Sequence, residues 1–164
     1  MFGAVCGDII GSYYERHSTK QYDFQLFHRS STFTDDSIMT AAVCDAILFR
    51  PAPITLYELQ SRAKEYALRY KAFYARYPHS GFGHKFKKWA RSDTLYIQNS
   101  FGNGGAMRVI PIGYAYDTLQ QIELQAHASC LYTHAHPEAV QGAKAVASAG
   151  FLARTGHSRE EIRT

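Results

Sequence analysis

One short segment, Thr-Asp-Asp-Ser at residues 34–37, holds residue types that could either cap a helix or bind a metal ion. Threonine is a good N-cap, and aspartates in a first turn interact favourably with the helix dipole. Consecutive helical positions diverge by about 100°, so Asp35 and Asp36 could also approach one or two metal ions from different directions. With the Thr34 hydroxyl, the ligands are all oxygen, which favours Mg²⁺ or Mn²⁺ over zinc. Both interpretations stay open at this point.

Two further carboxylates precede this segment. Asp8 interrupts an apolar helical pattern over residues 1–15, which predicts a carboxylate that is paired or buried. It could support the metal site or be a satisfied polar group of the core, and we favour the core. Glu15 ends the same pattern and by itself indicates a surface residue at a helix end.

A glycine-rich segment, Ser-Phe-Gly-Asn-Gly-Gly-Ala-Met-Arg at residues 100–108, is the second candidate site. Glycines around Asn103 would let consecutive backbone N–H groups turn toward one point and bind an anion, especially a diphosphate. The segment matches neither a Walker A loop nor a GxGxxG turn, and a plain tight turn is the alternative. Further along, His134 and His136 precede Pro137 at the head of a helix, where a histidine could cap the helix or bind a ribose or phosphate.

Helical periodicity dominates the chain, and no strand alternation is present. The expected helices cover residues 1–15, 35–49, 55–77, 85–93, 118–132 and 136–154, with another after the glycine-rich turn. The sequence therefore predicts one all-α domain over residues 1–164. Gly3, Gly7 and Gly11 fall on one helix face, and because glycine weakens a helix by about 1 kcal/mol relative to alanine, they predict a closely packed neighbouring helix.

Composition indicates a globular protein, with 46% apolar residues, 20% charged residues and a formal charge of +4. A basic cluster at residues 85–91 favours a basic helix surface over a phosphate site, and nucleic acid is not an expected partner. No membrane span or signal peptide is expected. Cys6, Cys44 and Cys130 are far apart in apolar segments, which predicts reduced, buried thiols and a cytoplasmic location.

Near its end the chain starts another helix, because Ser158 and Glu161 have the spacing of a capping box. We therefore expect residues 1–164 to be the front part of a longer architecture. Apolar surface meant for missing helices would be exposed or covered by self-association.

The order of these motifs resembles the ADP-ribosylglycohydrolase family, which includes dinitrogenase reductase-activating glycohydrolases and ADP-ribosyl-acceptor hydrolases. Gly-Asp-x-x-Gly with Glu15 comes first, then Thr-Asp-Asp-Ser, then the segment at 100–108, then Thr-His ahead of an Ala/Gly-rich helix. The resemblance spans residues 3 to 150. It implies an all-α fold with a binuclear magnesium or manganese site in a cleft between helices.

The resemblance also implies a role for each candidate residue. It makes Thr34, Asp35 and Asp36 metal ligands, and it places Glu15 at the scissile bond, with Asp36 or Glu15 as the base. The substrate-binding residues would be Ser100, Gly102, Asn103, Gly104, Gly105 and His134. The family cleaves the glycosidic bond between ADP-ribose and a protein side chain or another acceptor, so ADP-ribosylated proteins or small ADP-ribosyl compounds are the expected substrates.

One departure from the family pattern bears on these roles. The family's C-terminal Asp-x-Asp-Thr metal segment has no counterpart in residues 1–164, so half of the metal shell is missing from this chain. The leading hypothesis is a metal-dependent ADP-ribosyl hydrolase. The alternative is a non-catalytic ADP-ribose-binding or structural relative that has lost half of the metal site.

Overall fold

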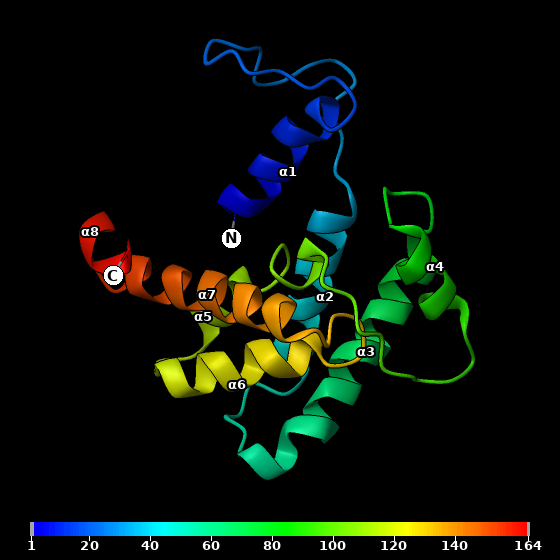
Figure 1. The fold of residues 1–164 in the computed structure, drawn as a ribbon, viewed down its shortest axis with the longest axis vertical. Coiled ribbons are helices and arrows are strands. Elements are labelled where there is room, and N and C mark those ends of the chain that lie inside the picture. The colour runs from blue at the N-terminus through cyan, green and yellow to red at the C-terminus, as the bar shows by residue number, and fades with distance from the viewer. Residues whose placement is uncertain (1, 164) are drawn as a thin grey trace.

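The computed structural model describes residues 2–163, and helices are its only regular secondary structure (Figure 1). The all-α class predicted from the sequence is confirmed. The α-helices are α1 (Phe2–Tyr14), α2 (Asp35–Phe49), α3 (Leu59–Arg76), α4 (His84–Arg91), α5 (Ile110–Ala115), α6 (Leu119–Cys130), α7 (Pro137–Arg154) and α8 (Arg159–Arg163). Short 3-10 helices occupy Leu56–Glu58 and Asn103–Gly105. None of the helices in the described part is long and apolar enough to cross a membrane.

The body of the fold is a set of helices packed in pairs around α3 and α7. Helix α3 packs against α2 and α6, and α7 packs against α5 and α6 (Figure 1). Helices α5 and α7 approach closely at Gly113, where a Cβ atom would lie 2.3 Å from the carbonyl oxygen of Ala147. Only glycine fits such a contact, which brings the segment after the glycine-rich turn tightly onto α7.

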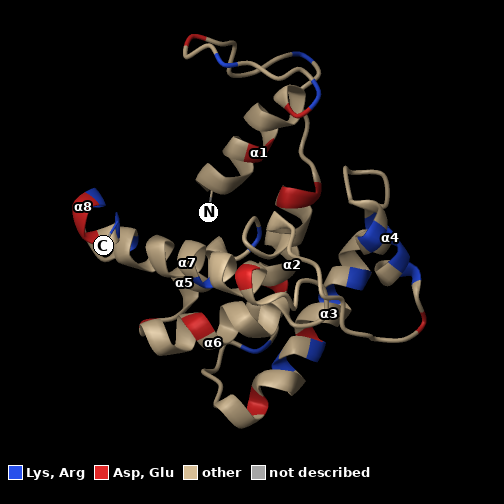
Figure 2. Ribbon diagram, viewed as in Figure 1, with Lys and Arg blue, Asp and Glu red and all other residues tan. Residues whose placement is uncertain are grey.

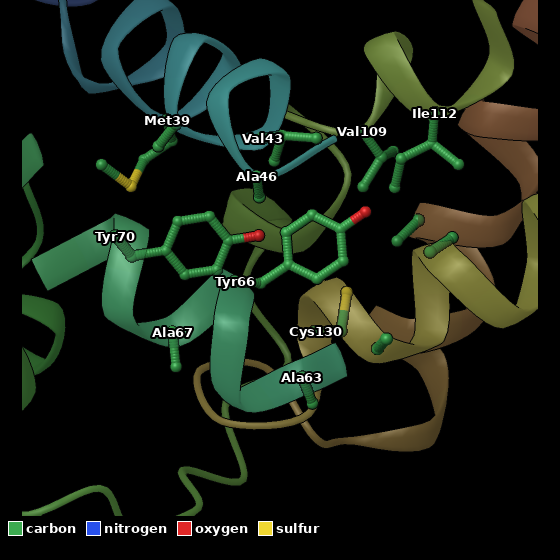
Figure 3. Packing of buried hydrophobic residues seen from close by; sticks show 14 of the residues in the cluster. Met39, Val43, Ala46, Ala63, Tyr66, Ala67, Tyr70, Val109, Ile112 and Cys130 are labelled. Atoms are coloured by element: carbon green, nitrogen blue, oxygen red, sulfur yellow. The ribbon is translucent and has the colours of Figure 1, made fainter. Parts of the chain in front are cut away.

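Two buried tyrosines join α3 to the helices on either side of it. The rings of Tyr66 and Tyr70 lie beneath the side of α2 that carries Met39 and Val43 (Figure 3). The Tyr66 hydroxyl donates to Oε1 of Gln125 at 2.9 Å, which ties α3 to α6. The apolar rings are therefore buried while their hydroxyl groups stay hydrogen-bonded, as buried polar groups must be.

Helix α1 stands apart from this body, packs mainly against α2, and has no buried residue (Figure 1). The prediction that another helix packs against its glycines is wrong for the described residues. Apart from the backbone of α1 itself, no atom lies within 4 Å of a Cβ built at Gly3, Gly7 or Gly11. The three glycines do lie on one face of α1, as their spacing predicts, but that face is open.

Three other expectations about the surface and the cysteines can be compared with the structure. Large apolar side chains are exposed, among them Leu48 and Phe49 at the end of α2, as expected. All three cysteines are free; Cys130 is buried, whereas Cys44 is half-buried and Cys6 is exposed on α1, so the expectation of buried thiols is wrong for Cys6. The capping box at the start of α8 is confirmed, because the Ser158 backbone N–H donates to Glu161 Oε2 at 2.8 Å.

Candidate functional site

Asp8 of α1 holds the first turn of α2. Its Oδ1 accepts from the Thr34 hydroxyl at 2.6 Å, and its Oδ2 accepts from the backbone N–H groups of Thr34 at 2.8 Å and Ser37 at 3.1 Å. The Ser37 hydroxyl donates to the same Oδ2. Asp8 is thus a satisfied polar group, as predicted, but it lies at the candidate site and not in the core that we favoured.

Thr34 caps α2, which confirms the capping interpretation of this segment. It is extended, with φ of −121°, and its Oγ1 accepts from the backbone N–H of Asp36 at 3.3 Å. Because its hydroxyl hydrogen is directed to Asp8, Oγ1 keeps a second lone pair that a cation could use. Capping and cation binding are therefore compatible at this residue.

Three carboxylates around this turn resist ionisation. Burial raises the pKa of Asp35 to about 6, and the charge of Asp36 adds to the rise. Burial and then Asp8 raise the pKa of Asp36. Partial desolvation, followed by Asp36 and Asp8, raises the pKa of Glu15. Asp8, Glu15, Asp35 and Asp36 are called the acidic group below, and Figure 2 shows acidic residues in the first turn of α2. Four carboxylates thus act on one another at one helix N-terminus.

The loop between α3 and α4 closes against this acidic group at Gly81. Its φ is +94°, and a Cβ atom there would lie 2.7 Å from Oδ1 of Asp35. The backbone conformation therefore favours glycine, and a Cβ would also displace the Asp35 carboxylate. Sequence reasoning treated this loop only as a turn, although the glycines of His-Ser-Gly-Phe-Gly-His were a signal.

A cleft of about 320 Å³ joins the acidic group to the glycine-rich segment. It is lined by Asp35 and Met39 of α2, by the start of α4, by the segment after α4 and by His134 in the loop after α6. The predicted site residues that line this cleft are Asp35, Ser100, Gly102, Asn103, Gly104 and His134. Residues about a hundred positions apart in the sequence therefore share one ligand-sized space.

The other predicted site residues lie outside this cleft. Glu15 and Thr34 line a neighbouring cavity of about 500 Å³, and Asp36 lines neither cavity. Gly105 is buried, and a Cβ there would lie 2.9 Å from Sγ of Cys130. The structure thus gives Gly105 a packing role against α6 and places the acidic residues between two cavities.

Gly104 and Gly105 are needed for space and not for an unusual backbone. Neither of them has a positive φ. Instead, a Cβ at Gly104 would lie 2.7 Å from both Cε1 and Nε2 of His134. The Cε1–Nε2 edge of the His134 imidazole therefore packs against Gly104, and a side chain at this position would displace the ring.

His134 is held by two residues that sequence reasoning did not assign to the site. Its Nδ1 lies 3.0 Å from Oγ1 of Thr133, and that oxygen accepts from Nη2 of Arg108 at 2.7 Å. Burial, together with the charge of Arg108, lowers the pKa of His134 to about 3, so its imidazole is neutral. By contrast, His136 is the N-cap of α7 and accepts from the backbone N–H of Glu138.

Arg108 also lines the cleft and was the clearest residue to have been missed. Its guanidinium is fully buried and stacks on the ring of Tyr70, with Cζ 4.0 Å from the ring centroid. A charged residue followed by the apolar run Val-Ile-Pro-Ile was the available signal, because an arginine is seldom fully buried without a specific partner.

Opposite stability effects are expected for two carboxylates of the acidic group. Asp8→Asn should lower the free energy of unfolding by about 1–3 kcal/mol, because the amide cannot accept all four hydrogen bonds from Thr34 and Ser37. Asp35→Asn should raise it by about 1 kcal/mol at neutral pH in EDTA, allowing for solvent screening, because the ionised carboxylate is disfavoured in the fold.

The pH dependence of the stability change in Asp35→Asn distinguishes a carboxylate that is disfavoured in the fold from one that only stabilises the start of α2. The folded pKa of Asp35, about 6, lies above the ordinary value of 3.8, so ionisation destabilises the fold as pH rises through this interval. The advantage of Asp35→Asn should therefore be full above pH 6 and absent below about pH 4. Urea unfolding followed by circular dichroism measures both variants; an Asp35→Asn protein that is less stable at neutral pH would contradict the prediction.

Comparison with known proteins identifies the family of this chain. The family described as ADP-ribosylglycohydrolase matches residues 1–164. ADP-ribosylhydrolase ARH3 of Homo sapiens is 30% identical, with 97% of this chain and 50% of the relative aligned. The Mus musculus protein of the same name is 31% identical, with 97% and 49% aligned. The chain spans about half the length of these curated relatives, and it belongs to the ADP-ribosylglycohydrolase family.

Proposed function

We propose that this protein acts in the hydrolysis of the glycosidic bond that joins ADP-ribose to a protein side chain or another acceptor. One observation carries the proposal: a single cleft contains Asp35 of the acidic group together with Asn103, Gly104 and His134. Family membership supports the same chemistry, since the named relatives are ADP-ribosylhydrolases. The substrate is an ADP-ribosylated protein or a small ADP-ribosyl compound.

The charges along the cleft suit such a ligand. Lys85 and Arg108 line it together with Asp35, so cationic and anionic groups occupy the same space. Lys85 is an exposed residue of α4, which Figure 2 shows as a basic helix. The cationic groups attract a diphosphate, while Ser100 and Asn103 offer neutral hydrogen-bonding groups for a ribose.

The acidic group would act on the reacting bond. Departure of the acceptor builds oxocarbenium character at the anomeric carbon, and nearby carboxylates stabilise that charge. Asp36 or Glu15 would accept a proton from the attacking water, and their raised pKa values bring them closer to the range of a base at neutral pH. The acceptor would occupy the neighbouring cavity of about 500 Å³, which Glu15 and Thr34 line.

Magnesium or manganese is the proposed cofactor. The donors are all oxygen, the carboxyl pKa values are raised in the absence of a cation, and Thr34 Oγ1 keeps a free lone pair. When bound, the ion would orient ribose hydroxyls and supply Lewis acidity. Thr34, Asp35 and Asp36 are the residues that would hold it.

A second candidate function follows from the incomplete set of donors. Among residues 2–163, no group of three His, Cys, Asp or Glu side chains is placed to hold a metal ion. This observation favours an ADP-ribose-binding relative without turnover. The two functions differ in one assay, release of free ADP-ribose from an ADP-ribosylated peptide.

Substitution in the glycine-rich segment should weaken nucleotide binding. Asn103→Ala is expected to lower the affinity for ADP-ribose about 5- to 10-fold, which corresponds to one lost hydrogen bond. The matched control is Asn99→Ala, because Asn99 is exposed nearby and does not line the cleft. Isothermal titration calorimetry measures both, and equal affinity of Asn103→Ala and the wild type would remove this segment from the site.

Metal dependence should be visible in thermal unfolding as well as in binding. Mg²⁺ should raise the Tm of the wild type and tighten ADP-ribose binding, and Asp35→Asn and Asp36→Asn should lose both effects. Asp93→Asn serves as the control, because Asp93 is exposed and outside both cavities. A Mg²⁺ response that persists unchanged in Asp35→Asn and Asp36→Asn would refute the proposed ligand set.

A further inference from the structure

Arg108 has a buried guanidinium group that is the donor in every hydrogen bond it forms. Its Nη2 donates to the backbone oxygen of Ser129 and to Oγ1 of Thr133, both at 2.7 Å. Its Nε and Nη1 are buried without a hydrogen-bond partner, and no carboxylate of residues 2–163 forms an ion pair with it. Guanidinium has five donors and no acceptor, so Arg108 can only donate.

The hydrogen of the Thr133 hydroxyl is therefore available to another group. Thr133 is fully buried, and Nδ1 of His134, 3.0 Å away, is the remaining polar atom bonded to its Oγ1. If Nδ1 carried the hydrogen, the Thr133 hydroxyl would be a buried donor with no acceptor, at a cost of about 1–3 kcal/mol. The favoured arrangement has Arg108 donating to Thr133, and Thr133 donating to Nδ1 of His134.

This arrangement determines the tautomer of His134. A neutral imidazole has one ring hydrogen, so a nitrogen that accepts leaves the hydrogen on the other nitrogen. His134 is neutral because it is buried next to the Arg108 charge, so the hydrogen is on Nε2. Nε2 lies on the side of the ring that packs on Gly102 and Gly104, at the cleft.

We propose that Arg108 and Thr133 are positioning residues that fix His134 as the Nε2–H tautomer, so that His134 presents a hydrogen-bond donor to an acceptor oxygen in the cleft. The acceptor would be a phosphate or ribose oxygen of the nucleotide, and this part rests on the proposed function. The tautomer itself depends only on the contacts among these three residues. It gives the cleft a neutral donor of fixed direction beside the cationic Lys85.

The test is the tautomeric state of His134 in the full chain, labelled with ¹⁵N-histidine. Long-range ¹H–¹⁵N correlation spectra distinguish a protonated ring nitrogen from an accepting one, and His134→Gln assigns the signal among the eight histidines. The wild type and Thr133→Ser, which keeps the hydroxyl, should both show Nε2–H at neutral pH. Thr133→Val, which has the same shape without the hydroxyl, should lose this preference.

Two results would overturn the proposal. One is an Nδ1–H tautomer in the wild type, which needs no variant and so holds even if Thr133→Val does not fold. The other is an unchanged tautomer in a folded Thr133→Val protein.

Titration with ADP-ribose separates this proposal from the proposed function. Thr133→Val should bind ADP-ribose about 5- to 10-fold more weakly than Thr133→Ser, because His134 no longer presents a fixed donor. The expected tautomers without any ADP-ribose binding would uphold the positioning role and count against the proposed ligand. Binding with equal affinity in the two variants would show that the His134 donor does not reach the nucleotide.

Discussion

Hydrogen bonds between Asp8 and the first turn of α2 are the interaction on which the candidate site depends. They join α1, which has no buried residue, to the helix that carries Asp35 and Asp36. The same contacts bring several negative charges to one helix N-terminus, where backbone N–H groups and the helix dipole partly offset their repulsion. Burial, followed by the charge of Asp36, raises the pKa of Asp35 to about 6. A cation held by these carboxylates would favour their ionised forms.

The packing of the other helices places the first turn of α2 at a cleft. Helix α2 is held by α3 and α5, and the loop at Gly81 closes on Asp35 from the other side. The glycine-rich segment is fixed separately, because His134 and Cys130 press against Gly104 and Gly105. Contacts between distant segments therefore fix both the Asp35 part and the glycine-rich part of the cleft lining.

Much of the helical structure could be predicted from the sequence, because local rules determine where helices begin and end. Periodicity and turn residues gave the helices, and Thr34 caps α2 as its residue type suggests. What could not be predicted depends on contacts between distant segments. The glycines of α1 have the spacing of a packed face but lie open, whereas Gly104 is crowded by His134, thirty residues away, and Gly105 by Cys130. The contact from Arg108 to Thr133 leaves no periodic signal in the sequence.

The methionine methyl groups can test whether the start of α2 and the glycine-rich segment form one ligand site. Met39 lies one turn after Asp35, Met107 follows the glycine-rich turn, and both line the cleft. In a chain labelled with ¹³C-methyl methionine, ADP-ribose added with Mg²⁺ should shift both signals with the same Kd. A shift of only one signal, or two different Kd values, would contradict a shared site, and binding that shifts neither would place the ligand elsewhere.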